Sequence, residues 1–237
     1  MSANSGEQVV WRSSSAPTGD RGLNAYMQKI YFFMALGLGV SGLMAYFVST
    51  SQFLANIIFR PGAFWLVALA PLFFVVVLSK AISKASSSTA LLLFAAYAAS
   101  VGVSLSSVFL VYTSQSIIST FLIVTGLFLG MSVYGYTAKK DLTSMGSFLL
   151  MGVLGLVIAM VVNIFMQNTM LSFALSALAV VIFTGLTAYD VQRARLSYDA
   201  VDNGDTATKK ALVGALMLYM DFVNLFIHML RLLGNRK

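Results

Sequence analysis

The sequence of 237 residues contains no cysteine and only one histidine. The absence of cysteine excludes disulfide bonds, thiolate catalysis and zinc sites built on cysteine ligands. A lone histidine excludes a zinc site held by two histidines, and no serine stands in the G-x-S-x-G setting of a hydrolase nucleophile. Nothing in the sequence therefore nominates an enzyme or a resident cofactor, and we expect neither.

Charged residues are also scarce. They make up 10% of the chain, against about a quarter in ordinary soluble domains, while hydrophobic residues make up 59%. A soluble core of this size cannot bury so much apolar surface, so lipid is the expected solvent. A helix needs roughly 20 apolar residues to cross a bilayer, and backbone groups in lipid must bond within their own span. The sequence predicts an all-α polytopic membrane protein of one domain, with seven transmembrane segments at residues 30–51, 62–79, 89–112, 117–137, 145–167, 170–191 and 211–233.

The residues ahead of the first segment are polar and rich in serine. We interpret residues 1–29 as a flexible tail and residues 30–237 as the transmembrane domain. Basic residues gather in the tail and in the second, fourth and sixth connections, and such connections favour the cytoplasmic side, so we expect a cytoplasmic N-terminus. Seven crossings then place Arg231, Arg236 and Lys237 outside, unless the last segment is re-entrant. The net charge of +7 fits attraction to anionic lipid headgroups, and we do not expect nucleic-acid binding.

Small residues repeat within two of the segments. The letters "GLGVSG" at 37–42 match a dinucleotide-binding pattern, but they lie inside an apolar helix rather than after a strand, so we discard that interpretation. Gly37, Ser41 and Ala45 repeat every four residues, which is typical of close helix packing in membranes. Gly126 and Gly130 form a G-x-x-x-G pair, and both patterns predict a tight bundle.

Polar residues form a narrow stripe on the last segment. At about 100° per residue, Asp221, Asn224, His228 and Arg231 fall within about 80° of arc. A charge at the bilayer centre costs about 2.5–3.5 kcal/mol on insertion scales, so we expect this stripe to face the bundle interior or a wet cavity. Other polar residues either line a path or bond helices to one another: Ser100, Ser104, Ser107, Asn163 and Gln167.

Two carboxylates lie in segments that should be dry. Asp190 is near the inner end of the sixth segment, and Asp221 lies about halfway along the seventh. Because these segments run antiparallel, the two side chains can meet and titrate as a coupled pair. Such a pair is a hard oxygen site that suits calcium. Two carboxylates fall short of the six to eight ligands of a tight calcium site, so binding would be weak, as conduction requires.

Two stretches carry a resemblance to a known family. "FTGLTAYDVQRAR" ends the sixth segment, and "ALMLYMDFVNLFIHMLRLLG" makes up most of the seventh. Together with the seven apolar segments, they resemble the signature stretches of the Bax inhibitor 1 family, also called the transmembrane Bax inhibitor motif family. The bacterial inner-membrane branch is the closer fit in length and tail.

The resemblance implies a bundle in which six helices surround the last one. It also implies a pH-sensitive calcium leak pathway in which the paired aspartates, here Asp190 and Asp221, act as the pH sensor. In that picture a basic residue at the inner end of the second helix bonds to the pair and closes the path. The candidate latch residues here are Lys84 and Lys80. A lysine contacts a carboxylate as a point charge and lacks the two-pronged bond of an arginine.

Two other functions stay open. Some bacterial members of the family are similar to modulators of a membrane protease. The alternative is therefore a non-transporting regulator of such a protease or of a stress response, with the tail as the feature that binds the partner. Intramembrane aspartyl proteases carry Y-D and G-x-G-D signatures. "AYD" at 188–190 matches the first, but Met220 precedes Asp221 where the second signature has a glycine, which speaks against a protease.

Overall fold

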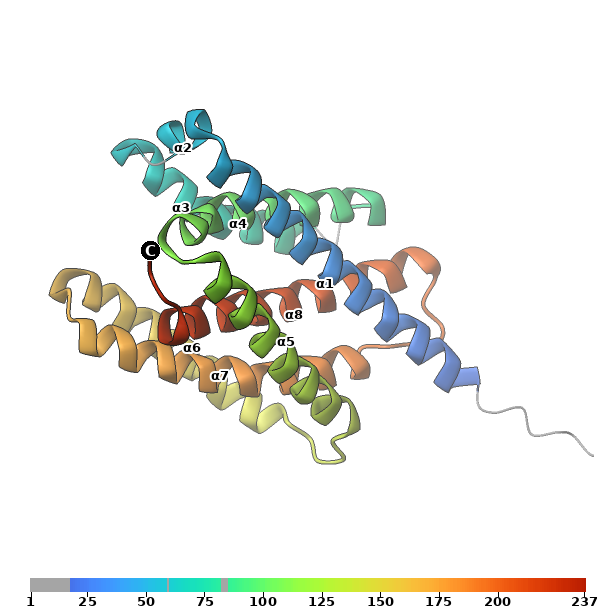
Figure 1. The fold of residues 1–237 in the computed structure, drawn as a ribbon. Coiled ribbons are helices and arrows are strands. Elements are labelled where there is room, and N and C mark those ends of the chain that lie inside the picture. The colour runs from blue at the N-terminus through green and yellow to red at the C-terminus, as the bar shows by residue number, and fades with distance from the viewer. Residues whose placement is uncertain (1–17, 59, 82–84) are drawn as a thin grey trace, which may run out of the picture.

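The structure is a computed structural model that describes residues 18–58, 60–81 and 85–237. These residues form eight α-helices (Figure 1): α1 (Thr18–Thr50), α2 (Gln52–Ile58), α3 (Pro61–Ala81), α4 (Ser87–Val111), α5 (Ser114–Thr137), α6 (Thr143–Met166), α7 (Thr169–Leu196) and α8 (Gly204–Leu233). Within the described residues, six helices are long and apolar enough to cross a membrane, namely α1 and α4 to α8. Helix α3, with 21 residues, lies where the second segment was predicted. The prediction of an all-α polytopic membrane protein is confirmed.

Helix α1 is longer than the first predicted segment. It begins at Thr18, and its first turns bury Tyr26, Met27 and Ile30 against the rest of the bundle. The short helix α2 follows in a stretch that the sequence left as a connection. The boundary between tail and transmembrane domain at residue 30 stays a prediction.

Helix α8 lies at the centre of the bundle, as expected. It packs against α1, α4, α5 and α7, and in Figure 1 it runs between these helices. In its most apolar stretch 61% of the residues are buried inside the protein, against 6% for α6. Helix α8 therefore meets protein on most of its circumference, whereas α6 exposes most of its surface to the bilayer.

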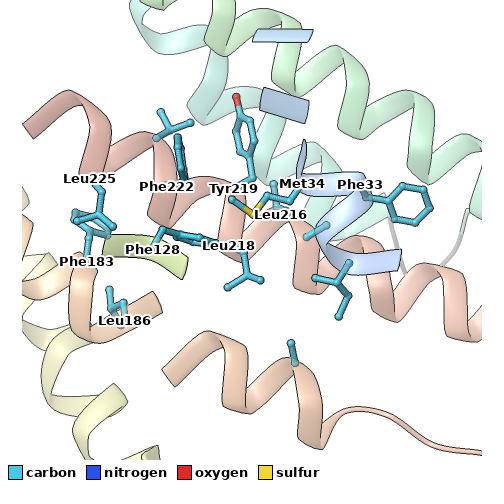
Figure 2. Close-up of a cluster of buried hydrophobic side chains, with 14 of the residues drawn as sticks. Phe33, Met34, Phe128, Phe183, Leu186, Leu216, Leu218, Tyr219, Phe222 and Leu225 are labelled. Atoms are coloured by element: carbon cyan, nitrogen blue, oxygen red, sulfur yellow. The ribbon is translucent and has the colours of Figure 1, made fainter. Parts of the chain in front are cut away.

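Aromatic side chains fix α8 among its neighbours. Figure 2 shows Tyr219 and Phe222 pointing to one side of α8 and Leu218 to the other. The Phe222 ring meets Phe128 of α5 at 5.5 Å between centroids, and the Tyr219 ring meets Tyr97 of α4 at 5.6 Å. Both pairs are edge-on, an arrangement worth about 0.5–1.5 kcal/mol beyond the buried area.

Small residues bring helix backbones together at some of the predicted positions. Ser41 and Ala45 are buried, and a Cβ at Gly102 of α4 would lie 2.5 Å from the Ser41 carbonyl oxygen, so the small face of α1 packs on α4 as predicted. The prediction for Gly126 and Gly130 was wrong. Both are exposed and have no neighbouring atom within 4 Å of an added Cβ, because α5 packs on α7 and α8 through its opposite face.

The last helix crosses the bundle once and is not re-entrant. It is continuous over 30 residues, which is about 45 Å at a rise of about 1.5 Å per residue. The residues after it pair with the α4–α5 connection: the Lys237 N–H donates to the Val111 carbonyl at 2.9 Å, and the Thr113 N–H donates to the Asn235 carbonyl at 3.1 Å. The C-terminus accordingly lies beside that connection in Figure 1.

The bundle has two ends, which we name by the chain segments found there. The N-terminal face carries the start of α1 and the connections at 138–142 and 197–203. The C-terminal face carries the connections at 112–113 and 167–168 and the residues 234–237.

Candidate functional site

The two aspartates from the predicted stripe and signature lie side by side in the structure. Helices α7 and α8 run antiparallel and pack along their length. The side chains of Asp190 on α7 and Asp221 on α8 lie close enough to interact directly. Two ionised carboxylates have no proton to share, so they can hydrogen-bond to each other only when one of the two groups is protonated. The arrangement therefore couples the protonation of one carboxyl group to that of the other.

The two carboxyl groups differ in their access to water. Asp221 is 4% exposed, and its Oδ2 atom receives no hydrogen bond from any described residue. Asp190 is half-buried, and the positive charge of Arg193, one turn further along α7, acts on it. An unsatisfied buried polar atom costs about 1–3 kcal/mol, so the interior holds Asp221 at the expense of stability.

Glycines hold α5 and α6 close to α7 just before Asp190. An added Cβ at Gly135 of α5 would overlap the Ala188 carbonyl oxygen. At Gly146 of α6 it would lie 2.5 Å from the Tyr189 ring. Backbones approach this closely only where no side chain intervenes. The two glycines thus fix the position of the α7 turn that presents Asp190.

Hydrogen bonds from Gln192 and Arg195 also hold the α7 turn that presents Asp190. Gln192 is buried; its Nε2 donates to the Lys140 carbonyl at 2.8 Å and its Oε1 accepts from the Leu142 N–H at 2.8 Å. The Arg195 Nη1 atom donates to the Tyr136 carbonyl at 2.6 Å. The sequence analysis missed Gln192; the available signal was its position directly after Val191, two residues beyond Asp190.

An exposed acid, Asp141, lies in the connection between α5 and α6. Asp141 accepts hydrogen bonds from the Thr143 hydroxyl at 2.6 Å and from the Thr143 N–H at 2.8 Å. These two bonds favour the charged form and lower the pKa of Asp141. Asp141 is therefore a fixed negative charge on the N-terminal face, outside the buried pair.

A second buried polar contact is made by Tyr219, two residues before Asp221 on α8. The Tyr219 hydroxyl and the Ser41 Oγ of α1 are 2.6 Å apart, and the Ser41 hydroxyl is also 2.7 Å from the Ala98 carbonyl of α4. Tyr219 is fully buried. This contact joins α1, α4 and α8 at the depth of the carboxyl pair. The sequence analysis gave Tyr219 no role.

The remaining members of the α8 stripe lie at different depths. His228 is buried, and its ring stacks on the Phe183 ring with 6.4 Å between the centroids. Its Nδ1 atom has no hydrogen-bond partner among the described residues. The Asn224 Nδ2 donates to the Met220 carbonyl on its own helix at 2.9 Å. Arg231 is exposed at the C-terminal face. Their predicted roles stay predictions.

A cavity of about 600 Å³ opens between α3, α4 and α8 on the C-terminal side of the pair. Met220 and Tyr97 line it, as do the polar side chains of Asn224, Ser104 and Ser107. The Ser104 hydroxyl also donates to the Val67 carbonyl of α3 at 2.7 Å. Ser104 therefore both bonds α4 to α3 and lines the cavity, so the two interpretations are compatible at this residue.

The candidate latch lies outside the part of the chain that can be described. Lys84 falls in the gap at 82–84, and the side chain of Lys80 is likewise outside the described atoms. Within the described residues, no group of three or more histidine, aspartate or glutamate side chains could hold a metal ion.

Comparison with known proteins gives consistent results along the chain. The profile of the family described as "Inhibitor of apoptosis-promoting Bax1" matches residues 23–237. An uncharacterised protein of Borreliella burgdorferi is 46% identical over 216 residues, covering 90% of this chain and 93% of the relative. The inner membrane protein YbhL of Escherichia coli K12 is 39% identical over 229 residues, covering 95% and 98%. An uncharacterised protein of Rickettsia prowazekii, RP147, is 40% identical over 230 residues, covering 97% and 98%.

Proposed function

The chain belongs to the Bax inhibitor 1 family, and from this premise we propose that it is a pH-sensitive cation leak pathway of the bacterial inner membrane that prefers calcium. The observation that carries this proposal is the close pair of Asp190 and Asp221 inside the bundle, nearer to its N-terminal face. An ionisable residue inside a membrane protein marks an ion or proton pathway by default. The proposal includes no enzymatic activity and no resident cofactor.

The charge of the pair changes with each proton that it binds. With both groups ionised the pair attracts a divalent cation through hard oxygen ligands. With one or both groups protonated the attraction weakens, because a proton occupies the site that the cation needs. Calcium occupancy of the pair should therefore fall as pH falls. A ligand that binds one state better shifts the balance between closed and open forms.

The interior is closed in this conformation. The cavity on the C-terminal side reaches Met220 and Tyr97, while the neighbouring Asp221 is 4% exposed. On the other side, Asp190 is half-buried near the N-terminal face. A leak therefore needs a movement of α7 or α8 that joins the cavity to the carboxyl pair.

The charge distribution supports one orientation. Basic residues cluster on the N-terminal face, at Arg21, Lys29, Lys139, Lys140, Arg193, Arg195, Lys209 and Lys210. Because basic connections favour the cytoplasmic side, we assign the N-terminal face to the cytoplasm and the C-terminal face to the outside. Tagging each end and measuring its accessibility in intact cells tests this orientation.

Calcium flux into liposomes tests the function. Purified wild-type protein should carry calcium at a rate that depends on pH. Asp190→Asn and Asp221→Asn should lose that dependence, because an amide neither titrates nor supplies a negative charge. Asp141→Asn is the matched control, since it removes an acid from the N-terminal face outside the pair. Flux that is unchanged and independent of pH in both pair variants would refute the proposal.

The alternative function is regulation of a membrane protease, and the same purified protein tests it. A regulator would carry no flux and would co-purify with a partner that is lost when residues 1–24 are removed. Flux without such a partner favours the leak pathway.

A further inference from the structure

A second cavity lies at the C-terminal face, away from the carboxyl pair. Its volume is about 460 Å³, and it lies where α6 ends, α7 begins and α8 ends. Arg231 and Arg236 both line it, together with the polar side chains of Asn163, Gln167, Thr169 and Ser172. None of the interpretations above gives this cavity a role.

The two guanidinium groups have no acidic partner among the residues that the structure describes. Neither Arg231 nor Arg236 makes a side-chain hydrogen bond or an ion pair with a residue that the structure describes. Every aspartate in the described ranges lies in the interior or at the N-terminal face. Two positive charges that share one cavity repel each other. A bound anion would remove that repulsion.

The polar wall of the cavity is preformed and presents donors. Asn163 is 9% exposed; its Nδ2 donates to the Ser172 Oγ at 2.6 Å, and its Oδ1 accepts from the Asn168 N–H at 3.2 Å. Because the Ser172 oxygen accepts this bond, its hydroxyl hydrogen is available for an acceptor in the cavity. Gln167 is held in the left-handed region, with φ of 51°, and its N–H donates to the Asn163 carbonyl at 2.8 Å.

The start of α7 adds to the positive potential. Thr169 lines the cavity and is the first residue of a helix of 28 residues. The first backbone N–H groups of a helix lack partners within the helix and attract anions. Asn168 caps one of them, the Leu171 N–H, at 3.0 Å.

Apolar side chains next to the cavity face the bilayer. Phe165 and Met170, on either side of the α6–α7 connection, are each 83% exposed. In a membrane they would contact acyl chains close to the headgroup level. A ligand that reaches the cavity from the lipid would thus keep its tail in the bilayer and its head between the arginines.

We propose that this cavity binds a phosphate group, with Arg231 and Arg236 as its cationic contacts and Ser172 and Gln167 as hydrogen-bond donors. Guanidinium groups suit phosphate because they donate two parallel hydrogen bonds to its oxygens. A phospholipid headgroup and free inorganic phosphate share this chemistry. Arg231 also lines the cavity of about 600 Å³, but the site does not include the carboxyl pair and does not require that the protein conducts ions.

Thermal unfolding of the purified full chain in detergent tests the site, because a ligand that binds the folded protein raises its Tm. The probes are phosphatidylglycerol, diacylglycerol with the same acyl chains, and inorganic phosphate. Phosphatidylglycerol should raise the Tm more than diacylglycerol, which lacks the phosphate. Arg231→Gln and Arg236→Gln should each weaken phosphatidylglycerol binding about tenfold, as expected for loss of one charge-assisted contact. Arg236→Lys should fall between wild type and Arg236→Gln.

Arg60→Gln is the matched control, because Arg60 is exposed in the α2–α3 connection of the same face and does not line the cavity. It should bind as wild type does. If inorganic phosphate also raises the Tm, the phosphate group alone suffices; if only phosphatidylglycerol does, the ligand is a lipid headgroup. Both results support the site. Equal shifts with diacylglycerol and phosphatidylglycerol, or equal binding by wild type and the Arg231→Gln and Arg236→Gln variants, would overturn it.

Discussion

The two ends of the bundle satisfy their charges in different ways. At the N-terminal face acids and bases pair with one another: Lys210 contacts Asp202 at 2.7 Å, and Lys209 contacts Asp205 at 3.0 Å. At the C-terminal face the described residues include basic side chains but no aspartate or glutamate, and cavities of about 600 and 460 Å³ open there. One end is closed by its own contacts, and the other leaves room and charge for something else.

This difference between the two ends explains the position of the Asp190–Asp221 pair. Asp221 is buried next to the closed end, where α5, α6 and α8 all press on α7. Rigid packing there keeps Asp190 and Asp221 in contact. The cavity at the open end reaches Met220, the neighbour of Asp221, but neither aspartate lines it. Substitutions that loosen the closed end should therefore lower the stability of the protein more than substitutions at the open end.

The largest expected loss of stability comes from placing a side chain at the close contact between α5 and α7. Gly135→Val should lower the free energy of unfolding by about 1–3 kcal/mol or more, because the new side chain overlaps the Ala188 carbonyl. Gly130→Val on the same helix should have little effect, since nothing lies within 4 Å of an added Cβ there. Unfolding by denaturing detergent, followed by circular dichroism, measures both. Equal losses at the two positions would contradict the close contact at Gly135.

The next effect comes from the bonds that hold the α5–α6 connection. Gln192→Leu should cost about 1–3 kcal/mol, because the Leu142 N–H and the Lys140 carbonyl lose their partner near a buried position. Gln115→Leu, at an exposed position of α5, is the control and should stay within about 0.5 kcal/mol. The same unfolding assay measures both variants. A Gln192→Leu variant as stable as wild type would show that the connection does not depend on these bonds.

A smaller effect is expected at the centre of α8. Tyr219→Phe keeps the ring between Phe94 and Tyr97 but removes the hydroxyl that meets Ser41. A net hydrogen bond is worth about 0.5–1.5 kcal/mol, so stability should fall by about that amount. Tyr46→Phe, 60% exposed on α1, should be neutral. If the two variants lose the same stability, the Tyr219 hydroxyl contributes nothing specific.

The sequence predicted most of the architecture because apolar length is a local property. Each long apolar run became a helix, and the two lone acids marked the interior. Contacts between segments that lie far apart in the sequence were harder to predict. The G-x-x-x-G spacing at Gly126 and Gly130 says that a backbone can approach, but it does not say on which side a neighbour lies. The early start of α1 at Thr18 was missed because the buried residues ahead of position 30, Tyr26 and Met27, are followed by the polar residues Gln28 and Lys29.

The candidate site divides in the same way. Asp190 and Asp221 stood out because charge in an apolar run is costly. Gln192 and Gly146 did not, because neither is unusual until α6 and its connection are packed against α7. The cavity at Arg231 and Arg236 depends on three helix ends that meet only in the fold. Lys84 and Lys80, the candidate latch, stay a prediction.

The most direct measurement of the proposed sensor is the release of protons when calcium is added to the purified protein in weakly buffered detergent. If Asp190 and Asp221 share a proton that calcium displaces, wild-type protein should acidify the solution on calcium addition. Asp190→Asn and Asp221→Asn should not, while Asp141→Asn should behave as wild type. Proton release that is absent in wild type, or equally large in the two pair variants, would contradict a shared proton and cation site.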